Sequence, residues 1–294
     1  MIAEIRKYFA ETDAIPVETR LLQSHGVTDP SVNNLTAQNE QGELAGYLQF
    51  SPEFAMKALV ADGAGDIYQI TRAFRGGEEG RLHRSEFRIL EWYRLGYDHH
   101  QLMDDVQALI EPLVSDTNWC RRSYAEVFRA HVGVDPHRAS NDFLFTRAST
   151  SMELEAAAIH DRALLFDVIF SHQIQPEFGA GEAIFIFDFP KEQAAYAQIR
   201  HEEDYVASRF ELLIDGVEIA NGYHEVTDPV EQAKRHAQER ARRESAGQQD
   251  IDFDPAFISA LGRGLPACAG VAVGLDRLIM TIFGADSLQA VEMR

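Results

Sequence analysis

The stretch RFELLIDGVEIANGYHE, residues 209–225, predicts a tight β-hairpin. Asp215-Gly216 is a strong turn signal, because both central residues of a type I′ turn need positive φ angles. A two-residue turn determines which residues face each other across the two strands. The expected pairs are Ile214 with Val217, Leu213 with Glu218, and Glu211 with Ala220.

Side chains alternate between the two faces of such a hairpin. The apolar face is expected to carry Phe210, Leu212, Ile214, Val217 and Ile219. Glu211 and Glu218 share the other face as diagonal neighbours. Two close carboxylates repel unless a cation lies between them, and oxygen ligands suit Mg²⁺ or Mn²⁺. The hairpin therefore indicates either a cation site or an ordinary solvent-facing pair of strands with scattered acids.

The composition limits the function classes. The chain has 294 residues, 45% of them hydrophobic, which is enough for a large core. Its net charge of −20 argues against a broad basic surface for nucleic acid. Cys120 and Cys268 have no metal-ligand spacing and are interpreted as reduced, buried thiols. Because neither a signal peptide nor a membrane-length apolar run is visible, we expect a soluble, cytoplasmic protein.

The rest of the chain predicts one α+β domain over residues 1–294, an antiparallel sheet flanked by helices. Apolar periodicity and capping residues locate the helices, and alternation locates the strands. Helices are expected at Met1–Glu11, from Ser51-Pro52-Glu53 to Val60, at Asp98–Leu113, around Tyr124–His131 and Leu154–Gln173, and at Pro229–Ala246 and Leu275–Phe283. Strands are expected at Gly46–Phe50, Ile67–Arg75, Glu86–Arg94, Glu182–Pro190 and Gly270–Gly274, and Leu21–Asn39 is expected to be a loop.

Two charged residues stand out within these elements. Glu91 shares a strand face with Phe87 and Tyr93, which is typical of an aromatic-walled polar pocket. The alternative is a half-buried strand whose glutamate pairs with one of the many arginines. Arg277 lies in the first turn of the helix after Gly274, where the helix dipole opposes a cation, so it needs an anionic or π-stacking partner.

Three features lie in an order that resembles the three signature motifs of the class II aminoacyl-tRNA synthetases. They are the helix ending near Pro16, the strand–loop–strand with Phe74-Arg75 at its mouth, and Gly-Leu-Asp-Arg entering a helix. FEL-x₅-E-x₂-NGYHE and HRSEF-x₃-EWY resemble the lysyl-tRNA synthetases, over essentially the whole chain. The anticodon-binding barrel of those synthetases is missing, and a free-standing lysyl-type catalytic domain is similar to the elongation factor P–(R)-β-lysine ligase family.

The resemblance implies an ATP- and Mg²⁺-dependent ligase. Such an enzyme activates (R)-β-lysine, or lysine, as an aminoacyl-adenylate and transfers it to a lysine of elongation factor P. It also implies a homodimer, with tRNA an unlikely partner and no role for a membrane. The alternatives are a related activating enzyme with another acceptor, including tRNA, and an inactive class II binding module.

The same resemblance implies roles for individual residues. The catalytic pair is Arg75 and Arg277, and the metal ligands are Glu211 and Glu218. The residues implied to bind ATP are Arg75, Glu78, His83, Phe87, Glu211, Glu218 and Arg277. Those implied to bind the amino acid are Ser51, Glu53, Glu91, Tyr93, Asn221, Glu225 and Ala272.

Two positions fit this pattern less simply. Strand parity puts Asn221 on the face opposite Glu218, so its role requires a β-bulge or a strand end. Gly77 stands where the second motif of the synthetases has a glutamate, and Glu78 is the residue that could replace it. The chain also begins close to the first motif. In the class II synthetases, residues before that motif support the dimer interface, so the stability of the expected dimer is open.

Overall fold

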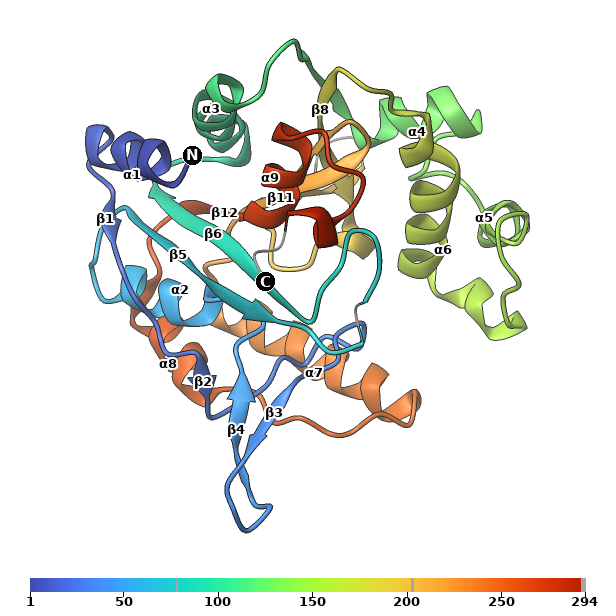
Figure 1. Ribbon diagram of the computed structural model, residues 1–294. Helices are drawn as coiled ribbons and strands as arrows, with labels where there is room; N and C mark the ends of the chain where they lie inside the picture. The colour runs from blue at the N-terminus through green and yellow to red at the C-terminus, as the bar shows by residue number, and fades with distance from the viewer. Residues whose placement is uncertain (78, 202–203, 292–294) are drawn as a thin grey trace. The chain divides into compact units, whose positions relative to one another are not determined.

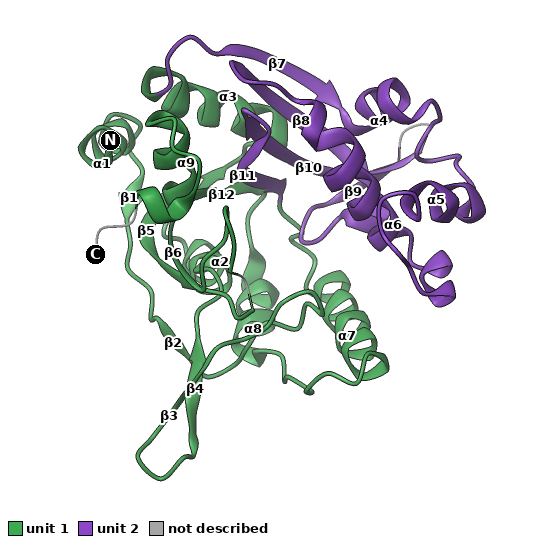
Figure 2. Cartoon of the chain, turned by 45° about the vertical axis from the view of Figure 1, so that its right-hand side comes forward, with its two compact units in different colours: residues 1–113, 225–294 green, residues 114–224 purple. Residues whose placement is uncertain are grey.

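The structure is a computed structural model that describes residues 1–77, 79–201 and 204–291. It divides into two compact units, described here one at a time. Unit 1 comprises Met1–Leu113 and Glu225–Arg294, and unit 2 comprises Val114–His224 (Figure 2). The prediction of a single domain over the whole chain stays a prediction.

Unit 1 contains a four-stranded run of sheet, a small sheet and six α-helices within the described residues. Its strands are β1 (Ile15–Pro16), β2 (Leu22–Gln23), β3 (Thr36–Gln38), β4 (Leu44–Leu48), β5 (Ile67–Phe74), β6 (Glu86–Leu95) and β12 (Cys268–Gly274). Its helices are α1 (Ile2–Glu11), α2 (Glu53–Ala61), α3 (His99–Ile110), α7 (Pro229–Ser245), α8 (Pro255–Gly264) and α9 (Leu275–Ile282), with short turns η1 (Glu111–Leu113) and η6 (Leu288–Ala290).

The strands of unit 1 follow the order β1-β5-β6-β12, with β1 parallel to β5 and the other neighbours antiparallel. The small sheet has the order β2-β4-β3. On one side, α2 and α8 pack together around Met56, Ile67 and Phe257 (Figure 1). In α1, the ring of Phe9 stacks on that of Tyr68 with 4.2 Å between centroids, which anchors the N-terminal helix.

Unit 2 contains the predicted hairpin. Its strands are β7 (Asn118–Ser123), β8 (Glu182–Pro190), β9 (Ile199–His201), β10 (Tyr205–Ile214) and β11 (Val217–His224). Its helices are α4 (Tyr124–Val132), α5 (Asn141–Ala148) and α6 (Arg162–Ile169), with short turns η2 (Ala156–His160), η3 (Phe170–Ile174), η4 (Gln175–Glu177) and η5 (Lys191–Gln193). The strand order is β11-β10-β8-β7, and β7 is parallel to β8. The short strand β9 pairs antiparallel with the first residues of β10. The α4 and α6 helices contribute Phe128 and Phe166 to a core that includes Leu213 of β10.

The hairpin register is partly as predicted. Asp215 and Gly216 both have positive φ angles, 53° and 72°, as a type I′ turn requires. The pairs Ile214–Val217 and Leu213–Glu218 are confirmed. The predicted pairing of Glu211 with Ala220 is wrong, because the register shifts between Leu212 and Leu213. Residue Glu211 pairs with Asn221 instead, so this bulge supplies the irregularity that Asn221 needed to share the face of Glu211.

Other expectations hold in type but differ in extent. The α+β class is confirmed, although the sheet is mixed because two strand pairs are parallel. The expected loop over Leu21–Asn39 contains β2 and β3, each only two or three residues long. The strand predicted at Gly46–Phe50 is Leu44–Leu48, and the helix predicted over Leu154–Gln173 is broken into η2, α6 and η3. No described helix has the length and apolar character needed to span a membrane.

Candidate active site

Strand β6 brings Glu91 and Tyr93 into the interior of unit 1. The Tyr93 hydroxyl donates a 2.7 Å hydrogen bond to Glu91 Oε1, and both side chains are buried. Pairing of β6 with β12 places Ala272 opposite Glu91 and Gly270 opposite Tyr93. The strand face predicted from Glu91 and Tyr93 is therefore a closed polar site, and Ala272 lines it from the neighbouring strand.

Two more predicted carboxylates meet at the same place, held by a residue that the sequence analysis did not identify. Lys57 of α2 is buried, and its Nζ lies 2.5 Å from Glu53 Oε1 and 2.6 Å from Glu225 Oε2. Glu53 precedes Lys57 by four residues on the same helix, which puts both on one helical face. Glu225 follows β11, and its backbone N–H donates to the Cys268 carbonyl.

Burial and mutual repulsion govern the protonation of this cluster. Burial, together with the charge of Glu53, raises the pKa of Glu91 to about 8. Burial raises the pKa of Glu225 to about 8 as well, although Lys57 opposes the shift. Burial alone would lower the pKa of Lys57, but Glu225 and Glu53 outweigh it and keep the ammonium charged. A buried carboxyl at this pKa gains from a second cation.

The floor of the cluster requires a glycine. A Cβ on Gly270 would lie 2.3 Å from Tyr93 Cε1 and 2.5 Å from Glu225 Oε1. Among the described residues, Glu91 Oε2 is buried with no hydrogen-bond partner. The site therefore presents an acceptor oxygen, a tyrosine ring and a glycine floor. These are the groups expected around an alkylammonium.

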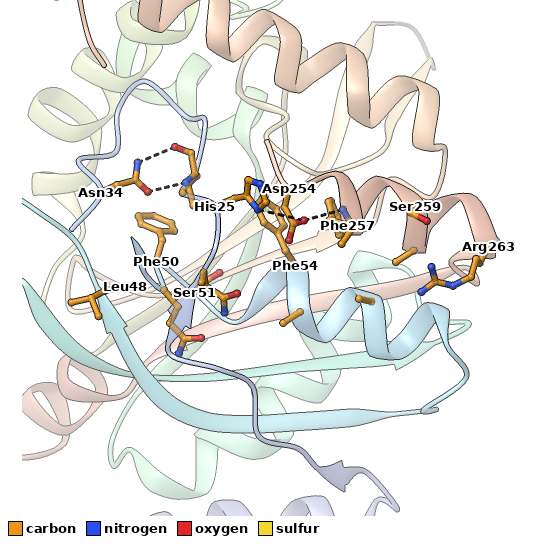
Figure 3. A pocket seen from close by; sticks show the side chains of 18 residues that line it. His25, Asn34, Leu48, Phe50, Ser51, Phe54, Asp254, Phe257, Ser259 and Arg263 are labelled. Atoms are coloured by element: carbon orange, nitrogen blue, oxygen red, sulfur yellow. Dashed lines mark hydrogen bonds and ion pairs between the residues drawn. The ribbon is translucent and has the colours of Figure 1, made fainter. Parts of the chain in front are cut away.

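Ser51 lies at the entry to α2, where its Oγ accepts a hydrogen bond from Glu53 N at 3.2 Å. It also lines a cavity of about 270 Å³ in unit 1, together with side chains of the small sheet, α2 and α8 (Figure 3). His25 and Asp254 face each other across this cavity, with 3.7 Å between Nδ1 and Oδ1. Of the predicted amino-acid-binding residues, only Ser51 lines it. The cavity is thus distinct from the carboxylate cluster.

Arg75 and Phe87 lie at the mouth of the hairpin formed by β5 and β6, as the sequence predicted. The guanidinium carbon of Arg75 is 3.9 Å from the ring centroid of Phe50 and 4.9 Å from that of Phe87. These cation–π contacts hold the guanidinium between two aromatic rings. They leave it pre-positioned for an anionic group such as a phosphate.

A second anchor joins β6 to α9. Asp276 accepts hydrogen bonds from Arg88 N and Arg88 Nε, each at 2.7 Å. The adjacent Arg277 donates from Nε to the Leu82 carbonyl at 3.1 Å. A carbonyl is neither an anion nor an aromatic ring, so the anionic or stacking partner expected from the sequence stays a prediction. The Arg88–Asp276 pair was not predicted from the sequence. Because Phe87 adjoins Arg88 and Arg277 adjoins Asp276, this pair fixes the backbone positions of Phe87 and Arg277 relative to each other.

The loop between β5 and β6 carries the other implied ATP contacts. His83 is exposed in this loop. Gly77 has a φ angle of +75°, and a Cβ there would lie 3.0 Å from Asn33 Nδ2. A glutamate at this position would therefore be strained, which gives a backbone reason for the departure from the synthetase motif. Glu78, its suggested replacement, lies outside the described residues.

In unit 2, the β-bulge aligns the predicted metal ligands. Glu211 and Glu218 lie on one face of the hairpin with Asn221, whose Oδ1 is buried without a hydrogen-bond partner among the described residues. Burial raises the pKa of Glu211 to about 7, although Arg209 opposes the shift, and Glu218 and Asp167 add to it. Arg209 forms a short ion pair with Glu211. Acids that repel one another and an orphaned amide oxygen form an oxygen donor set that fits Mg²⁺.

The chain matches the family model of class II tRNA synthetases (D, K and N) over residues 1–293. It is 39% identical to a protein of Yersinia enterocolitica and 39% identical to one of Vibrio cholerae, over 99% of this chain and 91% of each relative. A relative from Vibrio parahaemolyticus is 41% identical, over 99% of this chain and 92% of its own length. All three are named elongation factor P–(R)-β-lysine ligase. The chain belongs to the class II tRNA synthetase family.

Membership in the class II tRNA synthetase family confirms the resemblance seen in the motifs. It does not by itself assign residues. The geometry within each unit groups the predicted site residues. In unit 1, one group lies around Lys57 and consists of Glu53, Glu91, Tyr93, Glu225 and Ala272. A second group in unit 1 is the cation–π contact of Arg75 with Phe87. Unit 2 aligns Glu211, Glu218 and Asn221.

Proposed function

We propose that this chain is an ATP-dependent ligase for a diamino acid, (R)-β-lysine or lysine, with elongation factor P as the acceptor. The observation that carries the proposal is the cluster of the buried Glu91 and Glu225 with the half-buried Glu53, in which Tyr93 and Gly270 complete the walls. A diamino acid carries two ammonium groups, and buried carboxylates select cations over neutral side chains. The name of the relatives supplies the acceptor and the β-isomer.

In the first step of the proposed reaction, the substrate carboxylate attacks the α-phosphorus of ATP, and pyrophosphate leaves. Arg75, held between Phe50 and Phe87, stabilises the negative charge that develops on the phosphorus oxygens. Arg277 and Phe87 bind the adenine by stacking and cation–π contacts. Glu91, Tyr93 and Glu225 hold the side-chain ammonium, and Glu53 holds the other amine. Positioning and charge neutralisation supply the rate enhancement, so no covalent enzyme intermediate is needed.

Glu211 and Glu218 are the residues that would hold Mg²⁺, with Asn221 offering an amide oxygen on the same face. When bound, the ion neutralises negative charge on the phosphates. Arg209, the present partner of Glu211, keeps the carboxylate in place.

In the second step, the amine of a lysine side chain on the acceptor attacks the carbonyl of the aminoacyl-adenylate. The new amide bond forms as AMP leaves. Because the acceptor is a translation factor, we place the reaction in the cytoplasm, without a membrane or tRNA as partner. We propose a homodimer, in keeping with other class II enzymes.

The test is ATP–pyrophosphate exchange with (R)-β-lysine, with L-lysine and without amino acid. We expect exchange that depends on a diamino acid and is fastest with (R)-β-lysine. Glu225→Ala should abolish it, whereas Glu231→Ala, a partly exposed position on α7, should leave it unchanged. Absence of exchange with either amino acid would remove the ligase proposal, and preference for L-lysine would remove the β-lysine assignment.

A further inference from the structure

Lys57 is a fixed cation inside a site that the proposed function assigns to a substrate cation. Lys57 is 1% exposed. Its ammonium contacts carboxylates from two separate segments, Glu53 on α2 and Glu225 after β11. A buried charge of this kind is costly, so its presence needs an explanation beyond stability. Replacing such an ion pair by apolar residues of similar volume is often neutral or stabilising.

The charges around Lys57 come from every element that packs on it. Strand β6 contributes Glu91 and the Tyr93 hydroxyl, and β12 contributes the buried thiol of Cys268. Helix α8 packs against α2, but its Arg263 forms an exposed pair with Asp62 instead. Within the described part of the chain, the cluster thus contains three carboxylates and one ammonium.

Three carboxylates and one ammonium leave two negative charges when all are ionised. A diamino acid brings two ammonium groups. Their two positive charges balance the two net negative charges of the cluster. Without Lys57, Glu53 and Glu225 would repel each other across the site, and one would take up a proton. The ammonium also fixes the two oxygens that it contacts, which leaves Glu91 Oε2 as a buried acceptor with no described partner.

We propose that Lys57 is a positioning residue that sets the charge of the diamino-acid site. Its ammonium holds Glu53 and Glu225 together. Once all three carboxyls ionise around the bound substrate, it leaves a net two negative charges for the two amines of the substrate. The proposal rests on the proposed function, because it takes a diamino acid as the ligand. It assigns Lys57 no contact with the substrate and no proton transfer.

The test is isothermal titration calorimetry of L-lysine and (R)-β-lysine binding at neutral pH. Repeating each titration in two buffers of different ionisation enthalpy gives the number of protons released. Wild-type protein should release protons as ammonium groups bind carboxyls that are partly protonated. Lys57→Met should bind at least about tenfold more weakly and release about one more proton, because one more carboxyl is protonated before binding.

Three further variants separate charge from shape. Lys57→Gln has a neutral side chain of similar length that can still hydrogen-bond, and it should show the same weaker binding and extra proton release that we expect of Lys57→Met. It serves as the test if the methionine variant does not fold. Lys57→Arg keeps the charge and should restore the wild-type proton count. Lys234→Met, at an exposed position on α7, should match wild type throughout.

The outcomes distinguish this inference from the proposed function. Wild-type protein that binds neither amino acid would overturn both. Wild-type protein that binds, together with Lys57→Met or Lys57→Gln of unchanged affinity and proton release, would overturn only the role of Lys57. Weaker binding in the neutral variants with an unchanged proton count would mean that Lys57 shapes the site without setting its charge.

Discussion

Gly270 shows how closely the proposed diamino-acid site is packed. Its missing side chain makes room for the Tyr93 ring and the Glu225 carboxylate, both of which lie within 2.5 Å of where a Cβ would stand. The neighbouring Ala272 faces Glu91 across β12 and β6. In a packed site, even one added methyl group is felt. The specificity of the site therefore depends on the small residues of β12 as well as on its acids.

We predict that Gly270→Ala raises the KM for lysine by about tenfold to 100-fold, because the new methyl group displaces Tyr93 or Glu225. The KM for ATP should stay within about twofold of the wild-type value. Gly262→Ala is the matched control, since a Cβ at that helical position meets nothing within 4 Å. The measurement is pyrophosphate exchange at varied lysine and ATP. Equal lysine KM values in the two variants would contradict the packing argument.

The raised pKa values of Glu91 and Glu225, both about 8, predict opposite pH trends for stability and for binding. The folded protein holds protons that the unfolded chain, with an ordinary carboxyl pKa of 4.5, has already lost. The free energy of unfolding should therefore fall as the pH rises from about 5 to about 8. Affinity for lysine should rise over the same range, because its ammonium groups need ionised carboxylates.

Glu91→Gln removes one of these titrating groups and keeps the shape of the side chain. Thermal unfolding and lysine titrations across this pH range should show a flatter slope of stability in the variant. They should also show lysine binding that is close to wild type near pH 5 and falls increasingly below it towards pH 8, where wild-type Glu91 ionises. A variant with the wild-type slope would mean that Glu91 has an ordinary pKa in the folded protein.

At the scale of elements, the contact between strand β6 and helix α9 aligns the groups proposed to bind ATP. Strand β6 presents Phe87 and Arg88, and α9 presents Asp276 and Arg277. The Arg88–Asp276 pair, with a closest N···O distance of 2.6 Å, joins the two elements. The Asp276 carboxylate also accepts from the Arg88 backbone, so it orients the strand itself. The hydrogen bonds of Asp276 thereby hold Arg277 in register with Phe87.

We predict that Asp276→Ala raises the KM for ATP by about tenfold and lowers stability by about 1–3 kcal/mol, because it leaves a partly buried guanidinium and a backbone N–H without their acceptor. The KM for lysine should change little. Asp62→Ala removes an exposed partner of Arg263 and should cost at most about 1 kcal/mol. Chemical denaturation and exchange kinetics provide both readouts. An unchanged ATP KM in Asp276→Ala would show that Arg277 is oriented by other contacts.

The sequence predicted best those elements whose residues carry a local rule. Asp215-Gly216 dictated the hairpin turn, alternation located β5, and β6 and the apolar run of β8 were also located to within about two residues. Local rules do not encode the bulge between Leu212 and Leu213, which comes from packing of the strand on its neighbours. Strand β7 was missed because its exposed arginines hide the pattern, and α8 was missed because its apolar stripe is short, with Phe257, Ala260 and Leu261 as its buried residues.

At the scale of the whole molecule, the two units supply different parts of the proposed reaction. Unit 1 contains the carboxylate cluster and the arginines proposed for ATP, and unit 2 contains the hairpin acids proposed for Mg²⁺. The pattern of the hairpin indicated Glu211 and Glu218, the strand face indicated Glu91, and the family resemblance implied Glu53 and Glu225. Lys57 escaped notice because a lysine on an amphipathic helix is normally a solvated residue, and only the structure shows that its ammonium is buried.

The central claim is that this chain joins a diamino acid to a protein. The most direct measurement incubates the protein with ATP, Mg²⁺, (R)-β-lysine and purified elongation factor P, and then determines the mass of the factor. The account predicts a gain of one β-lysyl group on a single lysine, which is lost when Glu225→Ala replaces the wild-type protein. An unmodified factor in the presence of active pyrophosphate exchange would contradict the proposed acceptor.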